Sequence, residues 1–85
     1  MPHFVYILRC SDNSLYCGVS NNPKKRVKEH NTSKTKASRY TRTRRPVKLI
    51  YTEKYKDIKT AMQRESQIKK WNRKKKEDLI NNKLD

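Results

Sequence analysis

Arg26 and His30 are the first pair of side chains whose types and spacing could do chemistry. A helix is expected from Pro23 to about Asn31, because Asn22 is a favourable N-cap and proline suits the first helical position. Residues i and i+4 project from the same face of such a helix. A guanidinium beside an imidazole suits the binding of a phosphate and its water, while a solvated basic face is the simpler alternative.

Glu65 is the carboxylate that stands out in this basic chain. We expect a helix from Ile58 to about Trp71, capped by Asp57. Its apolar stripe consists of Ile58, Ala61, Met62 and Ile68. At roughly 100° per residue, position 65 falls within about 60° of every member of that stripe. A buried unpaired carboxylate costs several kcal/mol, so Glu65 needs an arginine partner or a metal ion, and a structural Glu–Arg pair is the alternative to a metal site.

Two tyrosines, Tyr6 and Tyr16, fall on the two strands of an expected hairpin. The strands cover residues 3–10 and 15–19 and are joined by a turn. Tyr16 leads directly to Gly18, the only glycine in the chain. In a chain with a single glycine, we expect that glycine where φ is positive or where another group approaches the backbone closely. Two packing tyrosines and an ordinary strand-end bulge are the alternatives.

These pieces together resemble the signature of a known nuclease superfamily. Val5–Tyr6, followed after nine residues by Tyr16–Gly18, is similar to the paired motif of the GIY-YIG nucleases. Phe4 stands where the first motif has glycine and Cys17 where the second has isoleucine, changes that should affect packing more than chemistry. The likeness covers essentially the whole chain. It is greatest to the small, stand-alone bacterial members related to the nuclease domain of the excision-repair protein UvrC.

The resemblance also implies a role for each candidate residue. The family's catalytic arginine, its histidine and its metal-binding glutamate follow in the order Arg26, His30 and Glu65. In that scheme Arg26 stabilises charge on the reacting phosphate, and Glu65 binds the metal ion. His30 bonds either a tyrosine hydroxyl or a water at the metal. Tyr6 and Tyr16 position the attacking water, and one of them takes its proton.

The implied reaction is the hydrolysis of DNA phosphodiester bonds with one divalent ion, Mg²⁺ or Mn²⁺, by an endonuclease that acts on DNA structures in repair or recombination. The residues independently favour one metal ion over two, because a two-metal site needs several convergent carboxylates. The other carboxylates are expected in turns, caps or exposed faces: Asp12, Glu29, Glu53, Asp57, Glu77, Asp78 and Asp85. The family's downstream asparagine has one candidate, Asn72. A non-catalytic nucleic-acid-binding protein on the same fold is the alternative function.

The charge of the chain predicts a polyanionic partner. Lys and Arg number 23 against 8 Asp and Glu, a formal charge of +15, which suits DNA, with RNA as the alternative. Two basic segments are expected to contact the nucleic-acid backbone: Lys34, Lys36, Arg39, Arg42, Arg44, Arg45 and Lys48 in the first, and Lys69, Lys70, Arg73, Lys74, Lys75 and Lys76 in the second. Tyr40 and Trp71 lie beside them and could stack on bases, although packing is favoured for Trp71.

These elements predict one α+β domain over residues 1–85, with a small three-stranded antiparallel sheet flanked by helices in the order β-β-α-β-α-α. The third strand is expected over Val47–Tyr55, after a short helical turn within residues 39–45, and the last helix over Lys74–Asn81. The longest apolar run, residues 4–8, is far too short to cross a membrane. Two cysteines without zinc-like spacing indicate reduced thiols, and a cytoplasmic monomer is expected.

Overall fold

The computed structural model describes residues 1–82, and its elements follow the expected order. Their bounds are β1 His3–Arg9, β2 Leu15–Ser20, α1 Pro23–Thr32, α2 Arg39–Arg42, β3 Lys48–Tyr55, α3 Ile58–Lys69 and α4 Arg73–Ile80. The short helical turn expected before the third strand is α2. Asp85 lies outside the described residues. None of the helices within residues 1–82 is long and apolar enough to cross a membrane.

The three strands form one antiparallel sheet with the order β2-β1-β3, so β1 is central and β2 is an edge strand. Tyr6 and Gly18 lie opposite each other across β1 and β2. In the turn between these strands, Asp12 accepts a hydrogen bond of 3.0 Å from the backbone N–H of Ser14, and Asn13 takes a φ of 69°. The predicted α+β fold with its three-stranded antiparallel sheet is confirmed.

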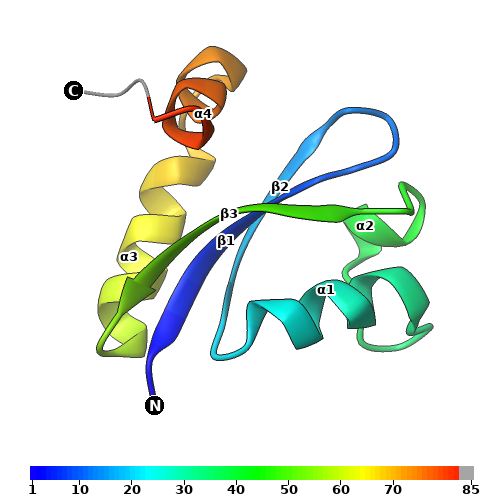
Figure 1. Cartoon of the computed structure of the whole chain (residues 1–85), viewed down its shortest axis with the longest axis horizontal. Coiled ribbons are helices and arrows are strands. Elements are labelled where there is room, and N and C mark those ends of the chain that lie inside the picture. The colour runs from blue at the N-terminus through cyan, green and yellow to red at the C-terminus, as the bar shows by residue number, and fades with distance from the viewer. Residues whose placement is uncertain (83–85) are drawn as a thin grey trace.

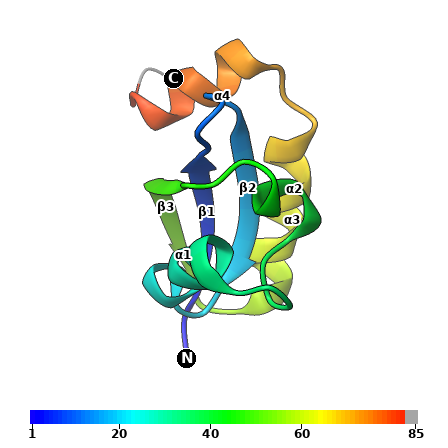
Figure 2. The ribbon, with the colours of Figure 1, turned by 90° about the vertical axis from the view of Figure 1, so that its right-hand side faces the viewer.

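Helices cover both faces of the sheet, with α3 on one side and α1 on the other (Figures 1 and 2). Val5 and Ile7 of β1 pack in the cluster on the α3 side, and the alternating residues Tyr6 and Leu8 pack on the α1 side. β1 is therefore buried on both faces, which explains its nearly continuous apolar sequence.

Side-chain caps define where the longer helices begin. Asn22 caps α1 and Asp57 caps α3, through hydrogen bonds of 3.2 and 2.8 Å from backbone N–H groups, as the sequence predicts. Asn72 caps α4 in the same way, at 2.9 Å. The carboxamide oxygen of this candidate active-site asparagine therefore already has a structural partner.

The side of α3 that packs on the sheet is narrower than its sequence indicates. Ala61 and Ile68 are buried, but Ile58 is 51% exposed and Met62 is 54% exposed. The predicted packing stripe is therefore wrong for Ile58 and Met62. Together with Glu65 these two residues occupy positions i, i+4 and i+7, a neighbouring stripe that lines a cleft instead of the core.

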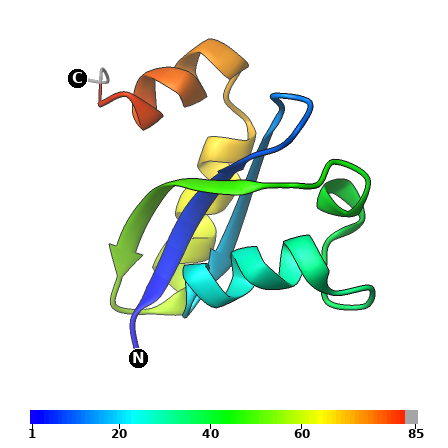
Figure 3. The same ribbon diagram turned by 45° about the vertical axis from the view of Figure 1, so that its right-hand side comes forward.

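Two half-buried carboxylates connect elements, although turns or exposed faces were expected for them. Glu53, inside β3, accepts hydrogen bonds from two tyrosines of its own strand and from Arg64 of α3. Glu77 of α4 accepts bonds of 2.7 and 3.0 Å from Arg9 of β1. Arg9 thereby holds α4 at the end of the sheet away from the N-terminus (Figure 3). The expectation is wrong for both carboxylates because each one lies where an arginine of another element can reach it.

Candidate active site

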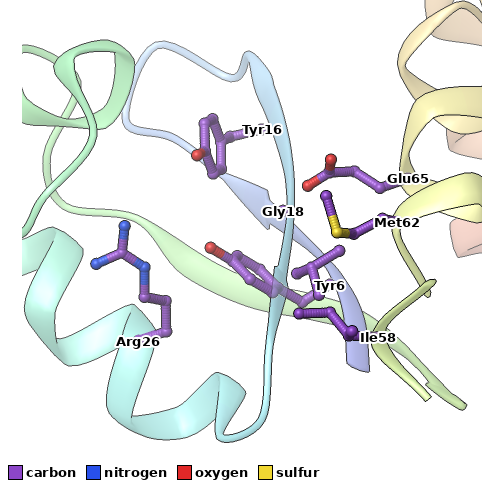
Figure 4. A pocket seen from close by; sticks show the side chains of 8 residues that line it. Tyr6, Tyr16, Gly18, Arg26, Ile58, Met62 and Glu65 are labelled. Carbon is purple, nitrogen blue, oxygen red and sulfur yellow. The ribbon is translucent and has the colours of Figure 1, made fainter. Parts of the chain in front are cut away.

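A cleft of about 290 Å³ opens at the edge strand β2. Tyr6 comes from β1 and Tyr16 and Gly18 from β2, while Arg26 projects from α1 on one side and Glu65 from α3 on the other (Figure 4). Because α1 and α3 cover opposite faces of the sheet, the cleft is built across the sheet edge. Four of the five predicted catalytic residues line it together.

Gly18 lets the ring of Tyr6 lie directly against the backbone of β2. A Cβ atom at position 18 would lie 2.5 Å from the Tyr6 hydroxyl oxygen and 2.6 Å from its Cζ, closer than side chains tolerate. The φ of Gly18 is not positive. Of the two uses expected for a lone glycine, the structure therefore supports a close approach of another group.

His30, the fifth predicted residue, lies behind the cleft and holds Tyr6. Its Nε2 is 2.9 Å from the Tyr6 hydroxyl, and its Nδ1 is 2.8 Å from the Thr41 hydroxyl. The backbone N–H of Ser38 also points at Nδ1, at 3.4 Å. A backbone N–H can only donate, which favours the tautomer with the proton on Nε2, so that His30 donates to the Tyr6 oxygen.

His30 is fully buried, at 0% exposure. This burial, aided by the nearby charge of Arg26, lowers the pKa of His30 to about 4, so the ring is neutral near pH 7. A buried neutral ring makes no direct contact with a phosphate, and the predicted phosphate-binding pair with Arg26 is therefore wrong for His30. Of its two predicted partners, a tyrosine hydroxyl is the one that the structure provides.

The two tyrosine hydroxyls lie in different environments, although both point toward the Arg26 side of the cleft (Figure 4). Burial raises the pKa of Tyr6 well above its usual value; Tyr16 adds to this effect and the charge of Arg26 opposes it. The ring of Tyr16 lies 6.4 Å from that of Tyr6 and 5.2 Å from that of His30. Within residues 1–82 the Tyr16 hydroxyl makes no hydrogen bond, so it is available to a water molecule or a substrate.

Arg26 is anchored through one end of its guanidinium. Its Nη1 donates to the carbonyl oxygen of Lys36 and lies 3.4 Å from a carboxylate oxygen of Glu29. The guanidinium also lies close enough to the Tyr6 hydroxyl to act on it, and this contact opposes the rise in the pKa of Tyr6. A fixed, planar guanidinium beside two tyrosine hydroxyls is well placed to bind a phosphate oxygen.

Glu65 is partly exposed, with 21% of its side chain accessible, and its one ion-pair partner among residues 1–82 is Lys69 at 3.6 Å. The alternative of a structural Glu–Arg pair is not what the structure shows, because the neighbouring Arg64 pairs with Glu53 instead. No three His, Cys, Asp or Glu side chains within the described range come together as a self-sufficient metal cluster. One accessible carboxylate does fit an Mg²⁺ or Mn²⁺ site that waters and a substrate phosphate complete.

The two basic segments follow α1 and α3, the helices that supply Arg26 and Glu65, and so begin on different sides of the cleft (Figures 1 and 4). Arg45 donates to the backbone carbonyls of His30 and Ser33 and thus supports the site from within. Other members already contact groups of this chain: Lys36, Arg42, Arg44, Lys69, Arg73, Lys74 and Lys75. Within residues 1–82, five make no ion pair, hydrogen bond or cation–π contact through their side chains: Lys34, Arg39, Lys48, Lys70 and Lys76.

Trp71 packs against the core cluster on the α3 side of the sheet. The guanidinium of Arg64 lies 5.1 Å and the ammonium of Lys75 lies 4.4 Å from the centre of its ring. These cation–π contacts agree with the predicted packing role.

Thr41 is the residue of the site that the sequence does not reveal. It is fully buried, and its hydroxyl contacts both His30 and Ser38, at 2.8 and 2.9 Å. A threonine within a strongly basic segment gives no apolar pattern from which burial could be predicted. The one local signal is Ser38, which caps α2 and thereby sets the position of Thr41.

The fold is that of a nuclease superfamily. Residues 2–78 match the GIY-YIG catalytic domain, and the chain belongs to this family. It is 48% identical over 81 residues to the UPF0213 protein YazA of Bacillus subtilis, covering 95% of this chain and 80% of that protein. It is 46% identical over 78 residues to a UPF0213 protein of Staphylococcus aureus, covering 92% of this chain and 93% of that protein.

Solved structures of relatives show the same fold. The solution NMR structure of the UPF0213 protein BH0048 from Bacillus halodurans superposes with a TM-score of 0.62 and 38% identity, covering 98% of this chain and 86% of that chain. That of protein EF2693 from E. faecalis superposes with a TM-score of 0.65 and 36% identity, covering 96% and 85%. The predicted resemblance to small, stand-alone GIY-YIG proteins is thus confirmed.

Proposed function

We propose that this protein is an endonuclease that hydrolyses DNA phosphodiester bonds with the help of one divalent ion, Mg²⁺ or Mn²⁺. The observation that carries the proposal is the meeting of Tyr6, Tyr16, Arg26 and Glu65, from four elements, in one cleft. Membership of a nuclease superfamily and the formal charge of +15 both support a nucleic-acid substrate.

Arg26 binds the phosphate that is cleaved. Its fixed guanidinium donates to a non-bridging oxygen and stabilises the negative charge that grows there as the attacking water adds. The anchoring bond to the carbonyl of Lys36 holds the guanidinium in place before the substrate arrives, which removes part of the cost of ordering it.

The two tyrosines hold the attacking water and receive its proton. Proton acceptance requires a tyrosinate, because a phenol near its usual pKa of about 10 is a poor base at neutral pH. Burial opposes a negative charge on Tyr6, and this effect on the pKa outweighs the favourable charge of Arg26. We therefore assign positioning of the water to Tyr6 and proton acceptance to Tyr16, whose hydroxyl makes no hydrogen bond within residues 1–82.

Glu65 holds the metal ion. When bound, the ion acts as a Lewis acid toward the phosphate and its leaving oxygen. Glu65 contributes one anionic ligand from α3, on the side of the cleft opposite Arg26 (Figure 4). A phosphate placed between these two side chains would be contacted from both sides.

Cleavage assays test this proposal. The protein is incubated with plasmid, branched and single-stranded DNA and with RNA of matched sequence, with Mg²⁺, with Mn²⁺ and with a chelator. We expect endonucleolytic cuts in DNA that require a divalent ion; preferential cutting of branched DNA would support a role in repair or recombination. Tight binding to DNA without cutting under every condition would instead identify a non-catalytic binding protein.

A further inference from the structure

Tyr40, in the short helix α2, packs against the catalytic Tyr16. The two rings are stacked, with centroids 6.0 Å apart and planes inclined by 28°. His30 contacts another side of the Tyr16 ring edge-on, at 5.2 Å and 64°. Since the hydroxyl of Tyr16 has no hydrogen-bond partner within residues 1–82, the packing of its ring is what sets its direction.

Arg44 covers the ring of Tyr40. Its guanidinium carbon lies 3.9 Å from the ring centre, well within cation–π range. Arg44 also donates to the carbonyl oxygen of Tyr40 at 2.9 Å. The ring of Tyr40 therefore already contacts two groups of this chain, the ring of Tyr16 and the guanidinium of Arg44, while Tyr40 as a whole is 37% exposed.

Asp12 connects the stacked side chains of Tyr40 and Arg44 to the hairpin that carries Tyr16. Its carboxylate accepts a bond of 3.0 Å from Nε of Arg44. The backbone N–H and the hydroxyl of Ser11 both donate to the carbonyl oxygen of Arg44, each at 3.0 Å. Ser11 and Asp12 form the turn that leads into β2, so the contacts run from Tyr16 through Tyr40 and Arg44 and return to the start of the same strand.

From this closed set of contacts we infer that Tyr40 is a positioning residue for Tyr16, held in place by Arg44 and Asp12. The inference rests on the proposed function for its catalytic consequence. It replaces the base-stacking role considered for Tyr40 and the phosphate-binding role considered for Arg44. In this view Arg26 and Glu65 act on the phosphate, and the packing of Tyr40 against Tyr16 keeps the Tyr16 hydroxyl pointing at the attacking water.

Steady-state cleavage by Tyr40→Ala and Tyr40→Phe separates positioning from base stacking. Misplacing a reacting group by about 1 Å costs on the order of 100-fold in rate, so Tyr40→Ala should lower kcat at least about tenfold while DNA affinity stays within about twofold. Tyr40→Phe keeps the ring and should restore kcat. If Tyr40 stacked on a base, the alanine variant would instead weaken DNA binding roughly five- to 150-fold with little change in kcat, and the inference would be overturned.

A second measurement needs neither DNA nor metal. The protein is labelled with 3-fluorotyrosine, and the signal of Tyr16 among the five tyrosines is assigned from Tyr16→Phe. Tyr40→Ala should shift the ¹⁹F resonance of Tyr16 and leave that of the distant Tyr51 in place. An unmoved Tyr16 resonance would refute the inference. A wild-type protein that cuts no DNA would refute the proposed function instead, and the ¹⁹F spectrum would still decide whether Tyr40 packs against Tyr16.

Discussion

Acidification should destabilise this fold through the buried His30. The pKa of His30 is about 4 in the folded protein and 6.5 in its ordinary state. Because the folded pKa is the lower one, the unfolded chain binds more protons between these values, and stability falls as the pH falls. A difference of about 2.5 pH units, at 1.36 kcal/mol each, amounts to a loss of about 3 kcal/mol in the free energy of unfolding.

About 2 kcal/mol of this loss should appear between pH 7 and pH 5, before the carboxylates of the unfolded chain titrate. Urea unfolding at a series of pH values measures it. His30→Gln keeps a hydrogen-bonding side chain without a titrating ring, so its stability should change much less over the same range. Equal slopes for wild type and His30→Gln would show that His30 is not a buried neutral ring and would refute its role as the support of Tyr6.

Three further changes test other parts of the site. Arg26→Lys should lower the cleavage rate at single turnover roughly 100-fold or more, because a point charge does not replace a fixed planar guanidinium. A rate within about threefold of wild type would show that Arg26 contributes only positive charge and does not bind the reacting phosphate. Gly18→Ala should force Tyr6 from its place, lower the free energy of unfolding by about 1–3 kcal/mol and impair cleavage; an unchanged melting temperature would contradict the close contact. Replacing residues 74–76 by alanine should weaken binding to all duplex sequences alike. The slope of log K against log salt should become shallower by about 2, because Lys75 already lies over Trp71 and only the other two lysines are counted as phosphate contacts. An unchanged slope would indicate that residues 34–48 make the DNA contacts instead.

Local patterns predict the hairpin and the helix caps, because these depend on neighbours in sequence, whereas the order of the candidate site residues follows from the resemblance to a family. Asn22 and Asp57 cap their helices as expected, and the opposing positions of Tyr6 and Gly18 follow from the short turn between their strands. The continuous apolar sequence of β1 indicates burial on both faces, and helices do cover both.

Contacts between distant segments are what the sequence does not reveal. Ile58 and Met62 have the spacing of a core stripe, yet they line the cleft, because Ala61 and Ile68 alone supply the buried contact of α3. The stacking of Tyr40 on Tyr16 joins residues of different elements, and no sequence periodicity in either segment predicts this contact.

A cleavage assay of Glu65→Gln in Mg²⁺ tests the central claim most directly. The amide keeps the size of the side chain but removes the anionic ligand, so cleavage should be abolished while binding to DNA is kept. Asp78→Asn, which removes a carboxylate of α4 paired with Lys74 at 4.0 Å, is the matched control and should cut like wild type. Cleavage at the wild-type rate by Glu65→Gln would contradict the metal-dependent mechanism and the assignment of this cleft as the active site.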